Sequence, residues 1–273
     1  MATTTPRKRT PKAVKAVVTV TKFTDAGNPF KVIRPAVSLA EFVPMHGGDY
    51  QATGYNTPLR DATARFVSHL ESLKQKDRVV IGLMADESGS MSGNEAAVIQ
   101  GVNDFVKGMA EVKKIDPKQA GTVLAVIATD GHENASKEIS AEALQNLVAA
   151  KEKEGFTFIF LGAQIDAWNV GMGTVGLSGG ITGQTISYRN TPAGTKAAFG
   201  NITTDSSVYL ADSGQYAAQM SGQTMKSVTD TGFVTTSNIN AQPGNTAVGT
   251  GVNIYVSPYS NVADALKKAK GEE

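Results

Sequence analysis

The sequence predicts an α/β fold built on an open, mostly parallel, doubly wound sheet, with an irregular, partly β extension at the C-terminus. The first observation is a set of three continuous apolar runs, at residues 78–85, 121–129 and 156–163. Such runs are typical of strands that are buried on both faces of a sheet. The second observation is that stretches with apolar residues at three- and four-residue spacing separate the runs, which indicates helices. Strands that alternate with helices form parallel sheets with helices on both faces.

Two elements are expected upstream of the first buried strand. Residues 16–23 and 29–37 are rich in β-branched residues and flank the turn sequence TDAGN, which predicts a β-hairpin. Residues 57–73 predict a helix, because Pro58 is tolerated in a first turn and the apolar residues share one face. That face comprises Leu59, Ala62, Phe66 and Leu70.

Three further helices are expected downstream. Residues 94–112 carry apolar side chains at helical spacing. Residues 140–155 open on Ser140, a favourable N-cap, and close on Gly155. Residues 191–202 form the last helix of the main domain.

Composition divides the chain into three parts. Residues 1–14 are basic and rich in Thr and Pro, which predicts a disordered arm. Residues 15–209 form the α/β domain. Residues 210–273 are rich in Gly, Ser, Thr and Asn and too poor in apolar residues for a core of their own. The strand-like segments GFVTT and VNIYV and a short terminal helix are expected to be ordered by contact with the main domain or a partner.

Bulk composition excludes several classes of function. The chain has 273 residues, a net charge of +1 and no cysteine, which rules out disulfides, thiolate metal sites and cysteine nucleophiles. The charge balance and the absence of aromatic residues among the basic residues of the arm argue against nucleic-acid binding. No apolar run approaches the roughly 18 residues that span a bilayer. The N-terminal sequence AVKAVVTV lacks a cleavage site, so we expect no signal peptide and no membrane association.

Oxygen-bearing side chains follow two of the buried strands. The sequence DESGSM places Asp86, Ser88 and Ser90 after the first strand, and ATDG places Asp130 after the second. Ligands of open parallel sheets bind outside the carboxyl ends of the strands. Carboxylates and hydroxyls without His or Cys are hard ligands that suit Mg²⁺ or Mn²⁺. Each motif alone is an ordinary turn, whereas together they predict a metal site.

These motifs resemble the von Willebrand factor A family, and particularly its bacterial and bacteriophage members. The resemblance covers about residues 15–209 and rests on DESGSM before a helix and ATDGHENAS after a later strand. It implies a Rossmann-like open sheet with a metal-ion-dependent adhesion site at its carboxyl edge. Asp86, Ser88 and Ser90 match the Asp-x-Ser-x-Ser motif of the family, and Asp130 matches its separate aspartate.

The third part of the family's site, a loop threonine before a helix, stands in an unusual place. In the family, a hairpin and the threonine loop come after the Asp-x-Ser-x-Ser strand. Here a plausible hairpin and YNTPLRDATARF precede it, and the helix after DESGSM leads directly to the next strand. We interpret this as an N-terminal block that has been transposed intact. Thr57 is then the threonine ligand, and residues 16–38 should form a hairpin on one edge of the same sheet.

A metal with an open position can capture a carboxylate or activate water. The sequence shows no Ser-His-Asp set, no P-loop and no second carboxylate cluster, and strand alternation points Glu87, the one nearby candidate base, away from the metal. We therefore predict a non-enzymatic, adhesion-type module with no catalytic residue. Its Mg²⁺ or Mn²⁺ would accept an Asp or Glu side chain of a partner protein.

Two other functions stay open. The chain could be a structural component of an assembly such as a phage particle, using the same site and self-associating through residues 210–273. An accessory subunit of a metal-dependent enzyme is less favoured. The expected location is the cytoplasm of a bacterial or phage-infected cell, or a virion. Of the other notable side chains, His69 is expected to be packed or solvated, His132 could line the rim of the site, and Trp168 is assigned to the core.

Overall fold

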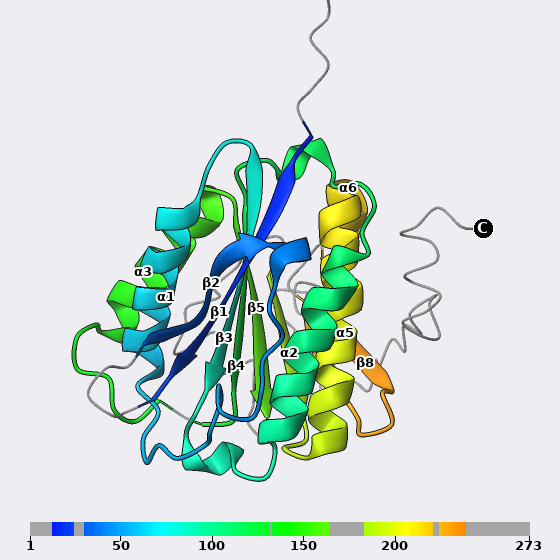
Figure 1. Ribbon diagram of the computed structural model, residues 1–273. Coiled ribbons are helices and arrows are strands. Elements are labelled where there is room, and N and C mark those ends of the chain that lie inside the picture. Colours follow the sequence, from blue (N-terminus) through cyan, green and yellow to red (C-terminus); the bar gives the residue numbers. More distant parts are fainter. Residues whose placement is uncertain (1–12, 25–29, 132, 164–182, 221–223, 239–273) are drawn as a thin grey trace, which may run out of the picture.

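An eight-stranded sheet forms the centre of the computed structural model, which describes residues 13–24, 30–131, 133–163, 183–220 and 224–238 (Figure 1). In spatial order the strands are β2 (Lys31–Ser38), β1 (Lys15–Phe23), β3 (Arg78–Asp86), β4 (Val123–Thr129), β5 (Phe156–Ala163), β6 (Gln184–Tyr188), β7 (Thr224–Val228) and β8 (Val234–Asn238). The six inner strands are parallel, and an antiparallel strand lies at each edge. The predicted fold class, an open and mostly parallel α/β sheet, is confirmed.

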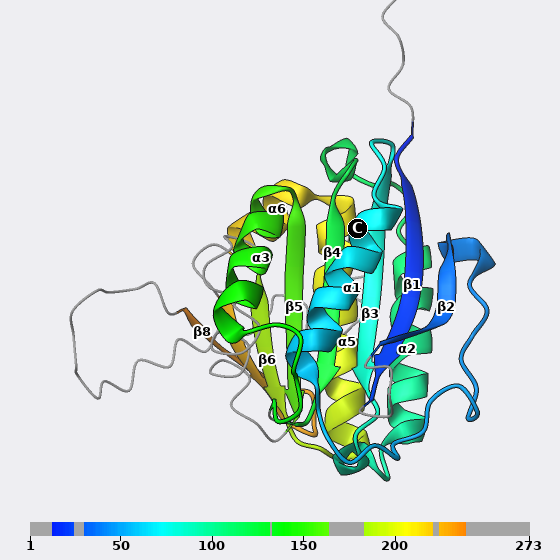
Figure 2. The ribbon, with the colours of Figure 1, turned by 90° about the vertical axis from the view of Figure 1, so that its left-hand side faces the viewer.

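Helices cover both faces of the sheet (Figure 2). One face carries α1 (Leu59–Leu73) and α3 (Ala141–Lys153), and the other carries α2 (Glu95–Ala110), α5 (Pro192–Ala211) and α6 (Ser213–Met220). Short 3-10 turns lie at Leu39–Glu41, Gly89–Met91 and Pro117–Gln119.

The inner strands are apolar throughout because both of their faces are buried. In β5, Phe158 and Phe160 pack towards α1 and α3, whereas Ile159 and Leu161 pack towards α2 and α5. All four side chains are fully buried. Strand alternation thus builds two separate cores from one continuous apolar run.

The N-terminal hairpin lies where the transposition hypothesis expects it. Strands β1 and β2 pair antiparallel, and β1 pairs in parallel with β3 over nine residues, from Lys15 opposite Arg78 to Phe23 opposite Asp86. Pro35 and two register irregularities in the hairpin make the edge strand β2 less able to pair with a strand of another chain. The predicted edge position of residues 16–38 is therefore confirmed.

The predicted ends of α3 and the predicted apolar face of α1 are also confirmed. The Ser140 hydroxyl accepts a hydrogen bond of 3.1 Å from the backbone N–H of Ala143 and caps α3. Gly155 follows that helix with a φ of +92°, a conformation that side chains with a Cβ rarely adopt. On α1, the predicted apolar face is buried.

The C-terminal part of the sheet differs from the expectation. The boundary placed at residue 209 falls within α5, which runs to Ala211, and α6 follows it. Strands β6 and β7 were not predicted, and the β7–β8 hairpin continues the main sheet. The physical reason is that α5 buries polar residues, so it lacks an apolar stripe over its second half. One of them, Asp205, forms a buried ion pair with Lys226 of β7.

Several predicted features lie outside the described residues. They are the basic arm up to residue 12, His132, Trp168, the VNIYV segment and the terminal helix. Within the part of the chain that is described, no helix is long and apolar enough to cross a bilayer.

Candidate metal centre

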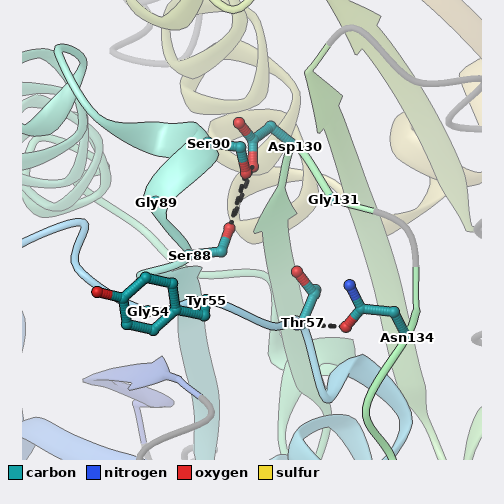
Figure 3. A pocket seen from close by; sticks show the side chains of 9 residues that line it. All are labelled: Gly54, Tyr55, Thr57, Ser88, Gly89, Ser90, Asp130, Gly131 and Asn134. Atoms are coloured by element: carbon teal, nitrogen blue, oxygen red, sulfur yellow. Dashed lines mark hydrogen bonds between the residues drawn. The ribbon is translucent and has the colours of Figure 1, made fainter.

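Three loops meet at the carboxyl edge of the sheet and line an open pocket of about 490 Å³ (Figure 3). Ser88 and Ser90 follow β3, Asp130 follows β4, and Thr57 lies two residues before the start of α1. The pocket is also lined by Gly54, Tyr55, Gly89, Gly131 and Asn134. In Figure 3 the Thr57 hydroxyl points into the same space as the Ser88 hydroxyl. Four of the five predicted ligands therefore line one pocket, whereas Asp86 does not line it and is linked to it by a hydrogen bond from Ser88 N–H.

The oxygen atoms of three of these residues are spaced like the ligands of a small cation. Ser90 Oγ donates a hydrogen bond of 2.7 Å to Asp130 Oδ1, and Ser88 Oγ lies 3.0 Å from Ser90 Oγ and 3.4 Å from Asp130 Oδ1. Adjacent ligands of an octahedral Mg²⁺, each about 2.0–2.1 Å from the ion, are about 2.9 Å apart. These three oxygens, which hydrogen bonds now join, could therefore also serve as adjacent ligands of Mg²⁺ or Mn²⁺.

Asp86 is held rigidly beneath the serines. Its side chain is fully buried, with Oδ1 accepting a hydrogen bond of 2.7 Å from the backbone N–H of Ser88 and Oδ2 accepting one of 2.5 Å from the Thr129 hydroxyl. Burial is the main cause that raises the pKa of Asp86 to about 7, against the effect of these hydrogen bonds. Burial also raises the pKa of Asp130, although Ser90 and Ser88 donate to it.

This charge arrangement favours a cation. None of the described residues that line the pocket is basic, so no side chain of the lining offsets the charge of the two carboxylates. Within the described part of the chain, no three Asp, Glu, His or Cys side chains gather at one point. Hydroxyl oxygens must therefore supply part of any ligand set.

The threonine loop is fixed to the end of β3 by backbone hydrogen bonds. Gly54 N–H donates to the Glu87 carbonyl over 2.9 Å, and Gly89 N–H donates to the Gly54 carbonyl over 2.6 Å. The Tyr50 hydroxyl donates to the carbonyl oxygen of Asp86. Further along the loop, Thr57 N–H donates to Asn134 Oδ1 over 2.8 Å, which joins it to the loop after β4.

Glu87 takes part in this anchoring and does not line the pocket. Its carboxylate oxygen Oε1 accepts hydrogen bonds of 2.7 Å from Lys22 Nζ and 2.8 Å from Gln51 N–H. The residue is buried. Glu87 therefore attaches the threonine loop to the Asp-x-Ser-x-Ser loop through its side chain as well as its backbone.

The start of α1 and the loop after β4 are interlocked. Buried Asp61 accepts hydrogen bonds from the backbone N–H groups of Lys137, Glu138 and Ile139 at 2.8 to 3.0 Å. In return, Glu133 Oε2 accepts one of 2.7 Å from Arg60 N–H. These contacts hold the threonine loop and the aspartate loop at a fixed separation.

Sequence reasoning missed two asparagines of the site. Asn134 lies four residues after Asp130, and its position in the same loop was the only available signal. Asn190 follows β6, a strand that the sequence did not reveal, and its Nδ2 donates a hydrogen bond of 2.6 Å to Asp130 Oδ2.

His69 is packed against the hairpin. Its Nε2 lies 3.2 Å from the Thr19 hydroxyl and its ring packs against Phe30. Partial burial lowers its pKa. Both contacts are with the hairpin, and His69 is not among the residues that line the pocket.

Fold and site together define an α/β protein with an oxygen-lined pocket at the carboxyl edge of a parallel sheet. Comparisons with protein-family models, curated proteins and solved structures give no match. The functional assignment therefore rests on the geometry of the pocket and on the motifs that build it.

Proposed function

We propose that this protein is a divalent-metal-dependent protein-binding module of the von Willebrand factor A type. Asp86, Ser88, Ser90, Thr57 and Asp130 would hold Mg²⁺ or Mn²⁺, some of them through water. The ion would offer its open coordination position to an Asp or Glu carboxylate of a partner protein. The observation that carries the proposal is that Thr57 lies with the serines and Asp130 in one pocket, although its loop comes first in the chain.

The proposal favours binding over hydrolysis because of where the acidic side chains lie. A water-activating site needs a general base within hydrogen-bond reach of the bound water. Glu87, the nearest candidate by sequence, is held by Lys22 and Gln51 away from the pocket. Tyr55, whose side chain is 93% exposed, stands at the rim, where a docked partner would contact it.

Participation in a larger assembly, such as a phage particle, is a second candidate supported by one observation. Strand β8 is one of the two edge strands of the sheet, and the chain continues beyond it over residues 239–273. An edge strand presents backbone groups that can pair with another strand. Electron microscopy and light scattering of the purified protein would reveal self-association, and a strictly monomeric protein would argue against this candidate.

Metal binding is expected to stabilise the protein modestly. At a free Mg²⁺ concentration about ten times the dissociation constant, binding adds RT ln 11, roughly 1.4 kcal/mol. Calorimetric or fluorescence melting of EDTA-treated protein should therefore show a rise of a few degrees on adding Mg²⁺. Thr57→Ala should reduce this rise, whereas Ser68→Ala, an exposed site on α1, should leave it unchanged. If the two variants respond alike, Thr57 is not a ligand.

Carboxylate capture can be tested with acetate, the smallest carboxylate probe. Acetate bound to protein-held Mn²⁺ should show strong paramagnetic broadening of its methyl proton signal. Asp86→Asn should reduce the broadening to that caused by the same concentration of Mn²⁺ without protein, because it removes one of the two carboxylates of the site. Mn²⁺ that binds to the wild-type protein without broadening acetate would mean that no position is open to a partner.

A further inference from the structure

Asn190 approaches the candidate metal site from a fourth loop, the turn between β6 and α5. Its Nδ2 donates a hydrogen bond of 2.6 Å to Asp130 Oδ2 and one of 2.9 Å to the carbonyl oxygen of Ser90. Its Oδ1 accepts a hydrogen bond of 2.6 Å from Asn94 Nδ2. The amide thus contacts two of the three residues whose oxygen atoms cluster in the pocket.

Because of this contact, the two carboxylate oxygens of Asp130 have different hydrogen-bond partners. Oδ1 faces the hydroxyls of Ser90 and Ser88, at 2.7 and 3.4 Å. Oδ2 is turned the other way and is occupied by the Asn190 amide. A cation in the pocket would therefore meet one oxygen of this carboxylate.

We propose that Asn190 is a positioning residue that keeps Asp130 a one-oxygen ligand and thereby sets a preference for Mg²⁺ over Ca²⁺. This inference rests on the metal site of the proposed function. Mg²⁺ demands six oxygens in near-ideal octahedral geometry, whereas Ca²⁺ takes six to eight and readily binds both oxygens of one carboxylate. Releasing Oδ2 would remove the restriction that disfavours Ca²⁺.

Asn94 orients the amide of Asn190. Asn94 is the residue before α2 and is buried, and the hydrogen bond from its Nδ2 to Asn190 Oδ1 turns Nδ2 of Asn190 towards Asp130. In Asn94→Asp the side chain can no longer donate to Asn190 Oδ1, so the amide of Asn190 loses the contact that fixes its orientation towards Asp130. Asp is a favourable residue at a helix N-cap, so this variant should fold.

The experiment measures the dissociation constants of Mg²⁺ and Ca²⁺ by isothermal titration calorimetry on the full chain. Replacing a residue that orients a metal ligand typically costs 10- to 100-fold in affinity. Asn190→Ala should weaken Mg²⁺ binding about tenfold without weakening Ca²⁺ binding, so that the preference for Mg²⁺ falls about tenfold. Asn94→Asp should shift the ratio in the same direction, although its added charge strengthens the binding of both ions.

Asn201→Ala on α5 is the matched control and should leave the ratio unchanged. Asn94→Asp keeps the test decisive if Asn190→Ala fails to fold by circular dichroism. If the wild-type protein binds Mg²⁺ and the folded variants have the same ratio of Ca²⁺ to Mg²⁺ dissociation constants as the wild type, this inference is wrong but the proposed metal site is not contradicted. A wild-type protein that binds neither ion would overturn both.

Discussion

Asp86→Asn is expected to stabilise the metal-free protein while abolishing its response to Mg²⁺. The Asp86 side chain is fully buried, and this burial raises its pKa to about 7, above the value of about 3.9 in an unfolded chain. Ionised Asp86 therefore destabilises the fold above neutral pH. At about 1.4 kcal/mol per pKa unit, a rise of about three units means that the neutral amide should gain on the order of 4 kcal/mol at pH 8.

The amide can be accommodated without loss of hydrogen bonds. Oδ1 of an Asn at position 86 can still accept from Ser88 N–H. The Thr129 hydroxyl, which now donates to Asp86 Oδ2, can accept from the new Nδ2 and turn its hydrogen towards the Gly131 carbonyl, 3.5 Å away.

The stabilising effect of Asp86→Asn should grow as the pH rises. Between about pH 4 and pH 7 the folded protein holds a proton on Asp86 that the unfolded chain has released, so the free energy of unfolding of the metal-free wild type falls as the pH rises through this range. The Asn variant lacks this contribution. Urea unfolding in EDTA at pH 5 and pH 8 should show the two proteins diverging towards pH 8.

The same titration should make the Mg²⁺ stabilisation larger at pH 8 than at pH 5, because the ion competes with the proton for the carboxylate. Asp104→Asn, at an exposed position on α2, is the control and should track the wild type. If Asp86→Asn is the less stable protein at pH 8, the buried carboxylate is stabilised by contacts that outweigh its desolvation.

Gly131→Ala is expected to cause the largest loss of metal affinity without altering a ligand. A Cβ at this position would lie 2.5 Å from Thr57 Oγ1, closer than a Cβ approaches other atoms in proteins, and 3.3 Å from Thr57 Cβ, which is a tight contact. The Thr57 side chain or its loop must move away from the pocket. We expect Mg²⁺ affinity, measured by calorimetry, to fall at least tenfold, about the effect of losing a group that orients a metal ligand.

A double-mutant cycle identifies the cause. In a Thr57→Ala background the nearest contact is gone, so adding Gly131→Ala should cost much less than in the wild type. Gly48→Ala is the matched control, since a Cβ there meets nothing within 4 Å. Additive effects of the two substitutions would show that Gly131 acts on the site by another route.

The sequence by itself determined the central sheet and most of the site. The strands β3, β4 and β5 follow from continuous apolar runs, because only strands buried on both faces need to be apolar at every position. Helices α1 and α2 follow from apolar periodicity, and α3 follows from its end signals, Ser140 and Gly155. The motif that holds Asp86, Ser88 and Ser90 and the turn that holds Asp130 were visible because each directly follows a readable strand.

Only the tertiary structure revealed the full length of α5 and the strands β6 and β7, because the local sequence of these elements shows no regular apolar pattern. Helix α5 buries Thr203, Ser206 and Ser207, and its partner strand β7 buries Lys226, so neither shows an apolar pattern. Asp205 makes Lys226 tolerable in the interior through an ion pair that only the folded chain forms. Strand β6 likewise buries Gln184 and Thr185. The sequence therefore concealed β6, β7 and the true end of the domain, and with them the loop that carries Asn190.

The position of Thr57 at the site also depends on the tertiary structure. Its sequence motif made Thr57 a candidate ligand, but a threonine before a helix is common. Its place beside Asp130 depends on contacts between residues that are far apart in the sequence. Gly54 is hydrogen-bonded to Glu87 and Gly89, and Thr57 is hydrogen-bonded to Asn134. Asp61 accepts hydrogen bonds from residues 137–139. Such contacts arise only when β1 pairs with β3 and brings the N-terminal block to the edge of the sheet. The pairing of strands in space, and not their order along the chain, therefore fixes where the loop of Thr57 lies.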